Sequence, residues 1–204
     1  MPCNIKCRIY WCLFTAGIIM LSGCTTTQSS KFYLLQTGVA DIGKAQLTEN
    51  NNTMVLGVGP VELPDYLNRP QIVTRVSGSE FHLSEFNRWA ESLEKNFSRV
   101  LAENLSTILS TDNVLIYPFE RSKEIERQVK VNILQLDGQP SGNVVLKVHW
   151  SLMGNDGKDL LLVKKSSFSG DAGKGYSGMV AGMNRLVSDF SQEVAREIKS
   201  RDNE

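Results

Sequence analysis

A strictly alternating segment in the second half of the chain limits the fold more than any other feature. Every second side chain is apolar in the series Val144, Leu146, Val148, Trp150 and Leu152. Lys147, His149 and Ser151 lie between these residues, and a period of two is typical of a strand with one buried face. Residues 128–136 and 159–168 flank this strand across turn-rich connections, so the three segments predict an antiparallel meander.

Two other segments carry the helical pattern, in which apolar residues recur at spacings of three and four. The first spans residues 87–110, and Ser84 or Asn87 is expected to cap its start. Its apolar stripe contains Trp89, Leu93, Phe97, Val100, Leu101, Leu105, Ile108 and Leu109. The second helix ends the chain, with a stripe of Tyr176, Met179, Val180, Met183, Val187, Phe190, Val194 and Ile198.

Shorter strands are expected at residues 32–35, 54–63, 71–76 and 114–117. Together with the meander they supply enough strands for a sheet, and each helix has one apolar face that must be covered. The sequence therefore predicts an α+β fold of two layers. In this fold, a mostly antiparallel sheet packs against two long amphipathic helices.

The N-terminus is built like a bacterial lipoprotein signal peptide. Two basic residues precede a thirteen-residue, almost wholly apolar stretch that ends at Leu21. A transmembrane helix needs about 20 such residues, so the stretch is too short to span a bilayer. The run Leu21-Ser22-Gly23-Cys24 resembles a lipobox, and we expect cleavage between Gly23 and Cys24 and lipid on Cys24. The alternatives are an ordinary secretory signal and an apolar helix packed in the fold.

The cysteines agree with this interpretation. Cys3, Cys7 and Cys12 fall in the segment that would be removed, and Cys24 is the fourth cysteine of the chain. The mature protein would then have no intramolecular disulfide and no cysteine-based metal site. Thr25 stands where lipoproteins retained at the inner membrane usually have Asp, so we expect anchoring at the periplasmic face of the outer membrane.

The expected organisation is a signal peptide at 1–23, a lipidated cysteine with a short tether at 24–31, and one domain at 32–204. The mature chain of 181 residues is long enough for a substantial core. Loss of Lys6 and Arg8 leaves 20 basic and 22 acidic side chains, a formal charge of −2 with no basic patch. Nucleic-acid binding is therefore not expected.

Residues 173–178 match the pattern G-x-G-x-x-G after a predicted strand and before a helix. A dinucleotide site also requires a parallel βαβ unit and an acidic residue at the end of the next strand. The terminal helix follows instead, so a flexible glycine loop that leads into a helix is the favoured interpretation. No cofactor is expected.

His82 and His149 are the two histidines of the chain. They lack the H-x-x-x-H spacing of a helical metal site, so the case for a metal is weak. A hydrolase that uses a serine and one of these histidines stays open, although no G-x-S-x-G pattern marks a nucleophile. The expectation is a protein that is not an enzyme.

Two features are candidates for contacts with a partner. Trp89 is either an exposed anchor or the first core residue of its helix, and its place in the apolar stripe favours the core. The turn Pro64-Asp65-Tyr66-Leu67 puts an apolar pair at a loop tip, where exposed aromatic and aliphatic residues often mark interfaces. Burial beneath the sheet is the competing explanation for this turn.

Several of these segments also resemble segments of a known family, and the resemblance rests on their order and spacing along the chain. They are Pro64-Asp65-Tyr66-Leu67, the helix from Trp89 through Leu93 to Asn104-Leu105-Ser106, the strand ending near Phe168, Gly175-Tyr176 before Met179-Val180, and residues 192–198. Most of the mature chain is covered. The chain is similar to the PqiC/YmbA family, the auxiliary lipoproteins of ABC-type and MCE-type intermembrane transport systems.

The resemblance implies a non-enzymatic outer-membrane lipoprotein that docks a PqiB-like periplasmic MCE protein and supports envelope integrity. A PqiA-like inner-membrane protein would complete the lipid-transport route. A ring-like homo-oligomer would suit the end of such a tunnel. The alternatives are a lipid-carrying periplasmic domain with its own apolar cavity and, with less support, an envelope hydrolase.

Overall fold

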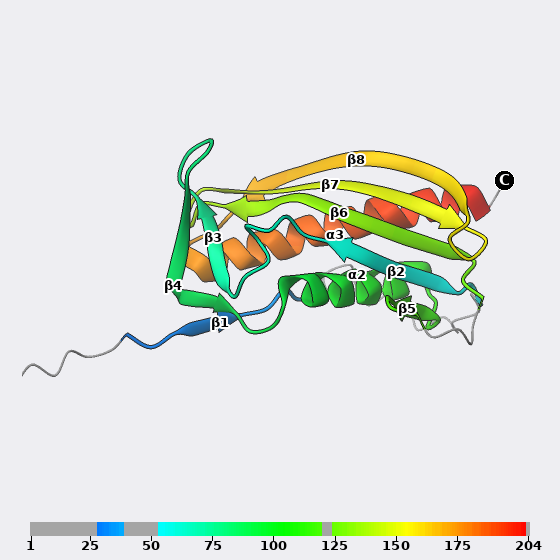
Figure 1. The fold of residues 1–204 in the computed structure, drawn as a ribbon, viewed down its shortest axis with the longest axis horizontal. Coiled ribbons are helices and arrows are strands. Elements are labelled where there is room, and N and C mark those ends of the chain that lie inside the picture. Colours follow the sequence, from blue (N-terminus) through cyan, green and yellow to red (C-terminus); the bar gives the residue numbers. More distant parts are fainter. Residues whose placement is uncertain (1–27, 39–52, 120–123, 203–204) are drawn as a thin grey trace, which may run out of the picture.

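The computed structural model describes residues 28–38, 53–119 and 124–202, and it confirms the α+β class (Figure 1). Eight strands and two helices form within these ranges. The strands are divided between a five-stranded and a three-stranded sheet, where the sequence suggested one sheet. Because the two sheets contain both parallel and antiparallel pairs, the topology is mixed, although the longest ladders are antiparallel.

The larger sheet runs in the order β5 (Val114–Ile116), β2 (Leu56–Glu62), β6 (Arg127–Gly138), β7 (Asn143–Gly154) and β8 (Asp159–Asp171). The antiparallel pairing of β6, β7 and β8 confirms the predicted meander. β2 joins β6 in parallel, and β5 joins β2 in parallel. All five apolar residues of the alternating series in β7 are buried, whereas Lys147 on the opposite face is exposed.

Two helices, α2 (Leu93–Leu109) and α3 (Gly175–Asp202), pack on one face of this sheet (Figure 1). The ring of Phe190 in α3 joins the layers, because its centroid lies 6.3 Å from that of Phe97, 5.9 Å from that of Trp150 and 6.3 Å from that of Phe168. Burial of each such side chain stabilises the fold by roughly 1.5–3 kcal/mol. Neither helix combines the length and apolar character needed to cross a bilayer.

The smaller sheet consists of β1 (Lys31–Tyr33), β4 (Phe81–Trp89) and β3 (Gln71–Arg75), in that order. β3 and β4 form an antiparallel hairpin, and β1 lies parallel to β4. This sheet lies at the end of the molecule from which the N-terminal segment extends (Figure 1). The smaller sheet therefore determines where a membrane anchor would leave the domain.

The helix expected over residues 87–110 was placed too early, because α2 begins at Leu93. Residues 81–89 form β4, so the expected caps Ser84 and Asn87 lie in a strand. The Ser84 hydroxyl oxygen accepts hydrogen bonds from the backbone N–H and the side-chain amide of Asn87, at 3.1 and 2.8 Å. Ser92 takes the N-cap position without a side-chain capping bond.

Backbone pairing with distant segments explains why the helix starts late. The N–H of Trp89 donates to the carbonyl of Pro70 at 2.7 Å, and that of Ala90 donates to Tyr33 at 2.9 Å. These bonds keep the chain extended where the apolar spacing alone suggests a helical turn. Trp89 is nevertheless buried, which confirms its expected place in the core.

Candidate membrane anchor and partner surfaces

The predicted anchor, Cys24 with its cleavage position after Gly23, lies outside the described residues. The described chain begins at Gln28, three residues before β1. What the structure shows is how the chain that follows the tether is held. The geometry around residues 31–36 therefore decides where a lipid on Cys24 would attach the domain.

Two asparagines hold the backbone just after β1. The side-chain oxygen of Asn96 in α2 accepts a hydrogen bond from the Leu35 N–H at 2.6 Å, and its amide donates to the Leu35 carbonyl at 3.1 Å. The Asn184 side chain in α3 accepts a hydrogen bond from the Gln36 N–H at 3.1 Å. Both Asn96 and Leu35 are buried, so this attachment is shielded from water. Both helices thus fix the point at which the tether joins the domain.

The four residues predicted to bind a partner form a turn between β2 and β3. The N–H of Leu67 donates to the carbonyl of Pro64 at 2.9 Å and closes the turn. Leu67 is only 2% exposed, Pro64 and Tyr66 are half-buried, and Asp65 is exposed. Of the predicted apolar pair, Leu67 belongs to the core, and Asp65 is the residue of the turn that a partner reaches most easily.

A buried carboxylate, Asp137 at the end of β6, holds this turn in place. It accepts hydrogen bonds from Arg75 Nε at 3.0 Å and Nη2 at 2.7 Å, from the Tyr66 hydroxyl at 2.9 Å, and from Gln135 at 2.8 Å. The Asp137 side chain is 1% exposed, and paired charge-assisted hydrogen bonds are what make such burial tolerable. Burial and, to a lesser degree, the Asp137 carboxylate raise the pKa of Tyr66.

An aromatic ring completes this cluster. The Phe81 ring stacks on Tyr66 with centroids 4.7 Å apart, and the Arg75 guanidinium lies 4.4 Å from the centre of the Phe81 ring. Hydrogen bonding to Asp137 also raises the pKa of Arg75. The cluster joins the turn, the β3–β4 hairpin and β6 into one unit. The sequence alone did not reveal this cluster, because Asp137 falls in a predicted turn and no local pattern links that residue to Arg75.

The face of the five-stranded sheet opposite the helices is open. It has a shallow hollow of about 320 Å³ whose lining includes Glu62, Asn132, His149 and Ser151. Strand register puts Asn132 between Glu62 and His149, and its side-chain amide donates weakly to Glu62 at 3.4 Å. Among the described residues no hydrogen bond joins His149 to a serine or a carboxylate. The hydrolase hypothesis therefore gains no assembled triad from this face.

The second histidine lies elsewhere. His82 is an exposed residue of β4 in the smaller sheet, and its carbonyl accepts a hydrogen bond from the Thr74 hydroxyl at 3.3 Å. The described residues contain no group of three or more His, Cys, Asp or Glu side chains arranged to hold a metal ion. The two histidines thus occupy different sheets and do not contribute to one site.

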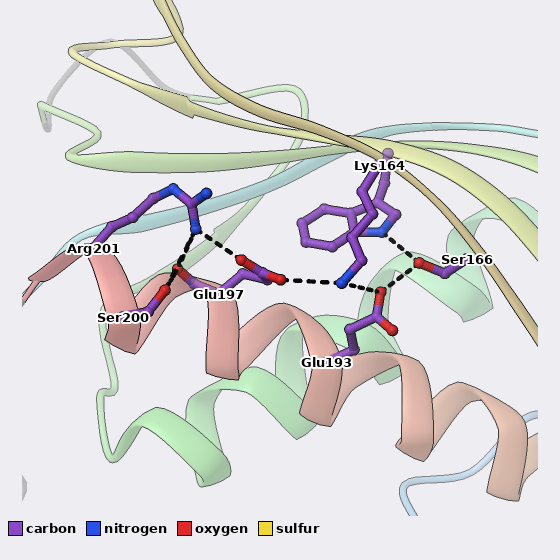
Figure 2. A network of polar contacts seen from close by, with 7 residues as sticks. Lys164, Ser166, Glu193, Glu197, Ser200 and Arg201 are labelled. Atoms are coloured by element: carbon purple, nitrogen blue, oxygen red, sulfur yellow. Dashed lines mark hydrogen bonds and ion pairs between the residues drawn. The ribbon is translucent and has the colours of Figure 1, made fainter.

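A polar network connects β8 to the C-terminal half of α3 (Figure 2). The Lys164 ammonium lies 3.0 Å from the Glu197 carboxylate and 3.5 Å from that of Glu193. Ser166 donates a short hydrogen bond to Glu193 and accepts one from the Trp150 indole at 3.0 Å. Each of these side chains has a partner within the fold, so the network fastens α3 to the sheet.

The charges of this network shift two pKa values. Hydrogen bonds from Arg201, at 2.8 Å, and then from Lys164 lower the pKa of Glu197. Hydrogen bonding to Glu197 is the main cause that raises the pKa of Lys164. Both shifts favour the charged forms at neutral pH. This network was not predicted from the sequence, although Glu197 and Arg201 have the i, i+4 spacing of a helical ion pair.

The glycines of the G-x-G-x-x-G pattern have a conformational role. Gly173 and Gly175 adopt positive φ angles of 65°, which L side chains rarely adopt. A Cβ on Gly178 would lie 2.5 Å from the Gly173 carbonyl carbon, so the loop folds tightly against the first turn of α3. α3 is the last element of the described chain, and no parallel strand follows it there. The favoured interpretation as a glycine loop is consistent with this geometry.

Comparison with known proteins identifies the family. Residues 33–195 match the model of the ABC-type transport auxiliary lipoprotein component family. This range contains most of α3 and both sheets, apart from the first two residues of β1. The chain belongs to this family. The match confirms the family resemblance that the sequence motifs predicted. The tether and the surfaces described above are therefore interpreted as features of an ABC-type transport auxiliary lipoprotein.

Two relatives carry a more specific name. The intermembrane transport lipoprotein PqiC of Escherichia coli (strain K12) is 27% identical over 188 residues, which cover 92% of this chain and 96% of that protein. The protein of the same name from Shigella flexneri gives the same values. The alignment therefore extends over nearly the whole length of both proteins. It also supports a lipoprotein of a Pqi-type transport system.

Solved structures agree on the fold. A crystal structure of an uncharacterized protein superposes with a TM-score of 0.67 at 22% identity, covering 84% of this chain and 99% of that chain. A protein from Xanthomonas campestris gives a TM-score of 0.59 at 9% identity, covering 69% of this chain and 81% of that one. At these identities the likeness concerns the arrangement of helices and sheets. The fold of this chain therefore also occurs in solved crystal structures.

Proposed function

We propose that this protein is the outer-membrane subunit of a PqiABC-like intermembrane lipid-transport system. In this role it docks a periplasmic MCE protein and supports envelope integrity. The main support is the family match over residues 33–195, together with the likeness to PqiC over nearly the full length of both chains. The lipobox-like run that ends at Cys24 supplies the anchor. The family is one of transport accessories, and the described residues present no assembled catalytic group.

The strength of the proposed membrane attachment follows from the number of acyl chains on the mature N-terminus. A single myristoyl chain binds a membrane with an association constant of only about 10⁴ M⁻¹, so stable attachment needs at least two chains. A bacterial lipoprotein carries two or three chains on its N-terminal cysteine. Lipid on Cys24 would hold the domain at the periplasmic face of the outer membrane almost permanently.

A partner has to cover the remaining distance to the inner membrane. A domain of this length has a radius of gyration of about 16 Å, so it cannot bridge the periplasm alone. A PqiB-like MCE protein would supply the span, and a PqiA-like protein would complete the route in the inner membrane. A homo-oligomeric ring of the domain would suit the end of such a tunnel.

The turn that carries Asp65 is our candidate for the partner contact. Its exposed carboxylate lies next to Tyr66, and the Asp137 cluster holds the loop in one conformation. A loop held in this way loses little conformational entropy on binding. Leu67 supports the loop from inside the core.

Site-specific photo-crosslinking in the source bacterium tests the proposal. A photoreactive amino acid at position 65 of the full-length, membrane-anchored protein should capture a PqiB-like MCE protein. Lys95, an exposed residue of α2, is the matched control position and should capture less of it. Recovery of only unrelated proteins from both positions would contradict the docking role.

A further inference from the structure

Five of the large apolar side chains that stay exposed belong to the smaller sheet or to its immediate flanks. They are Phe32, Leu34, Val76, Phe81 and Phe86. Phe32 is 64% exposed and Phe86 is 39% exposed, although both occur in strands that are otherwise paired. Exposed aromatic residues gathered at one end of a domain require an explanation, because they cost free energy in water.

The tether passes beside one of these residues, Phe86. A surface hollow is lined by Gln28 and Ser29 of the tether, Lys31 of β1, Phe86 of β4, and Lys174 just before α3. Lys31 and Lys174 are both exposed. Figure 1 shows the chain leaving the domain at this end, beside β1 and the bend of β4. Two cationic side chains and an aromatic ring therefore line the hollow at the point where the tether reaches the domain.

Chain length limits how far this end can be from the membrane. Only four residue steps separate Cys24 from Gln28, and an extended chain covers at most about 3.5 Å per residue. Gln28 must then lie within about 14 Å of the lipid-bearing Cα, a distance comparable to the thickness of a headgroup layer plus one side chain. This step rests on lipid being attached at Cys24, as proposed above.

We propose that Lys31, Phe86 and Lys174 around the hollow, with Phe32 on the other face of the edge strand β1, form a membrane-contact surface that lies against the phospholipid headgroups around the anchor. Aromatic rings are favoured at the boundary between headgroups and acyl chains, and lysines extend their ammonium groups to phosphates while their stems cover apolar surface. Glu85, next to Phe86 in β4, is also exposed and lowers the net charge near this surface. The contact sets the orientation of the domain on the bilayer.

Fluorescence quenching in the lipidated full-length protein tests this surface. Phe32→Trp and Phe86→Trp variants are reconstituted into vesicles of phosphatidylethanolamine and phosphatidylglycerol that contain brominated phospholipid. The matched control is Val163→Trp, an exposed apolar position of β8, which starts at the end of the molecule opposite to β1 (Figure 1). After subtraction of the emission of the parent protein, which keeps Trp89 and Trp150, the emission added at positions 32 and 86 should be quenched several-fold more strongly than that added at position 163.

Charge reversal provides the second measurement. Lys31→Glu with Lys174→Glu should weaken the quenching at Phe86→Trp, because each lysine near an anionic surface contributes roughly a five-fold factor to binding. Lys147→Glu with Lys165→Glu, exposed residues of β7 and β8, should leave the quenching unchanged.

The outcomes separate the two proposals. If the protein floats with the vesicles but positions 32 and 86 are quenched no more than position 163, the contact surface is refuted and the anchor stands. If the mature protein carries no lipid and fails to float, the anchor fails, and with it the orientation that depends on it.

Discussion

The side chain of Asn96 forms two hydrogen bonds with the backbone of Leu35, 61 residues away, and thereby ties the start of the domain to α2. An asparagine amide offers one acceptor and one donor in the same plane, so it can pair with a peptide unit as a neighbouring strand would. Both residues are buried, and water cannot replace either bond. If lipid is attached at Cys24 as proposed, the helix layer would therefore resist a pull on the N-terminal segment.

Asn96→Ala should destabilise the protein by about 2–4 kcal/mol, because the Leu35 N–H and carbonyl lose their partner inside the core. The matched control is Asn184→Ala, which removes a single exposed hydrogen bond to Gln36 and should cost no more than about 1 kcal/mol. Urea unfolding of the two variants gives the comparison. Equal midpoints would show that Asn96 does not anchor the tether.

Asp137→Asn should cost about 2–4 kcal/mol, because it removes the charge that Arg75 and Tyr66 pair with in a buried position. The pKa of Tyr66 should fall, because the carboxylate adds to the effect of burial in raising it. Chemical denaturation and an ultraviolet titration of the tyrosines measure the two effects. Asp65→Asn, on the exposed tip of the same turn, is the control and should stay within about 0.5 kcal/mol of the wild type.

Gly182→Ala should destabilise the packing of α3 by about 1–3 kcal/mol. A Cβ at this position would lie 2.8 Å from the Asp171 carbonyl oxygen and 2.9 Å from a Val144 methyl group, so helix and sheet must move apart. At Gly78, in the hairpin, a Cβ would meet nothing within 4 Å, and Gly78→Ala should change stability by no more than about 0.5 kcal/mol. Thermal unfolding of both variants provides the measurement, and an unchanged midpoint for Gly182→Ala would contradict the close approach.

The contribution of the Lys164–Glu197 pair should depend on pH at both extremes. The pKa of Glu197 is lowered in the fold, so its contribution is present above the usual value of 4.5 and is lost as pH falls through the lowered pKa. The pKa of Lys164 is raised, so its contribution is complete below 10.5 and is lost as pH rises through the raised value. The difference in unfolding free energy between the wild type and Lys164→Met should thus narrow in acid and in strong alkali.

Lys165→Met is the matched control for this measurement, because Lys165 carries the same charge, neighbours Lys164 in β8 and is exposed. Its unfolding free energy should follow that of the wild type across the pH range. A Lys164→Met effect that stays constant from neutral pH down to the acid transition would rule out the pairing with Glu197.

Cys24→Ser should leave an unprocessed precursor without lipid, since the thiol is the group that receives the acyl-bearing moiety. Mass spectrometry of the protein recovered from membranes checks this directly. Ser22→Ala keeps a small residue before the cleavage position and should mature normally. Normal processing of the Cys24→Ser variant would refute the lipobox interpretation.

The sequence was a good guide wherever a local pattern decides burial. The alternation from Val144 to Leu152 predicted a central strand and its buried face, because a period of two assigns each side chain to one side of a sheet. The apolar stripe from Met179 to Ile198 predicted the buried face of α3 for the corresponding reason. The family motifs likewise predicted membership, which the match over residues 33–195 confirmed.

Contacts between segments far apart in the chain determined the features that local patterns did not predict. Residues 87–89 were expected to begin a helix, yet they belong to β4, because β1 and β3 pair with the backbone of that strand on its two sides. Arg75 and Tyr66 meet Asp137 across 62 and 71 residues of chain, and no local spacing encodes that meeting. The fold class, the main elements and the family could thus be predicted from local sequence patterns. The pairing of polar groups in the core and the exposure of aromatic residues beside the tether could not, because both depend on contacts between segments far apart in the chain.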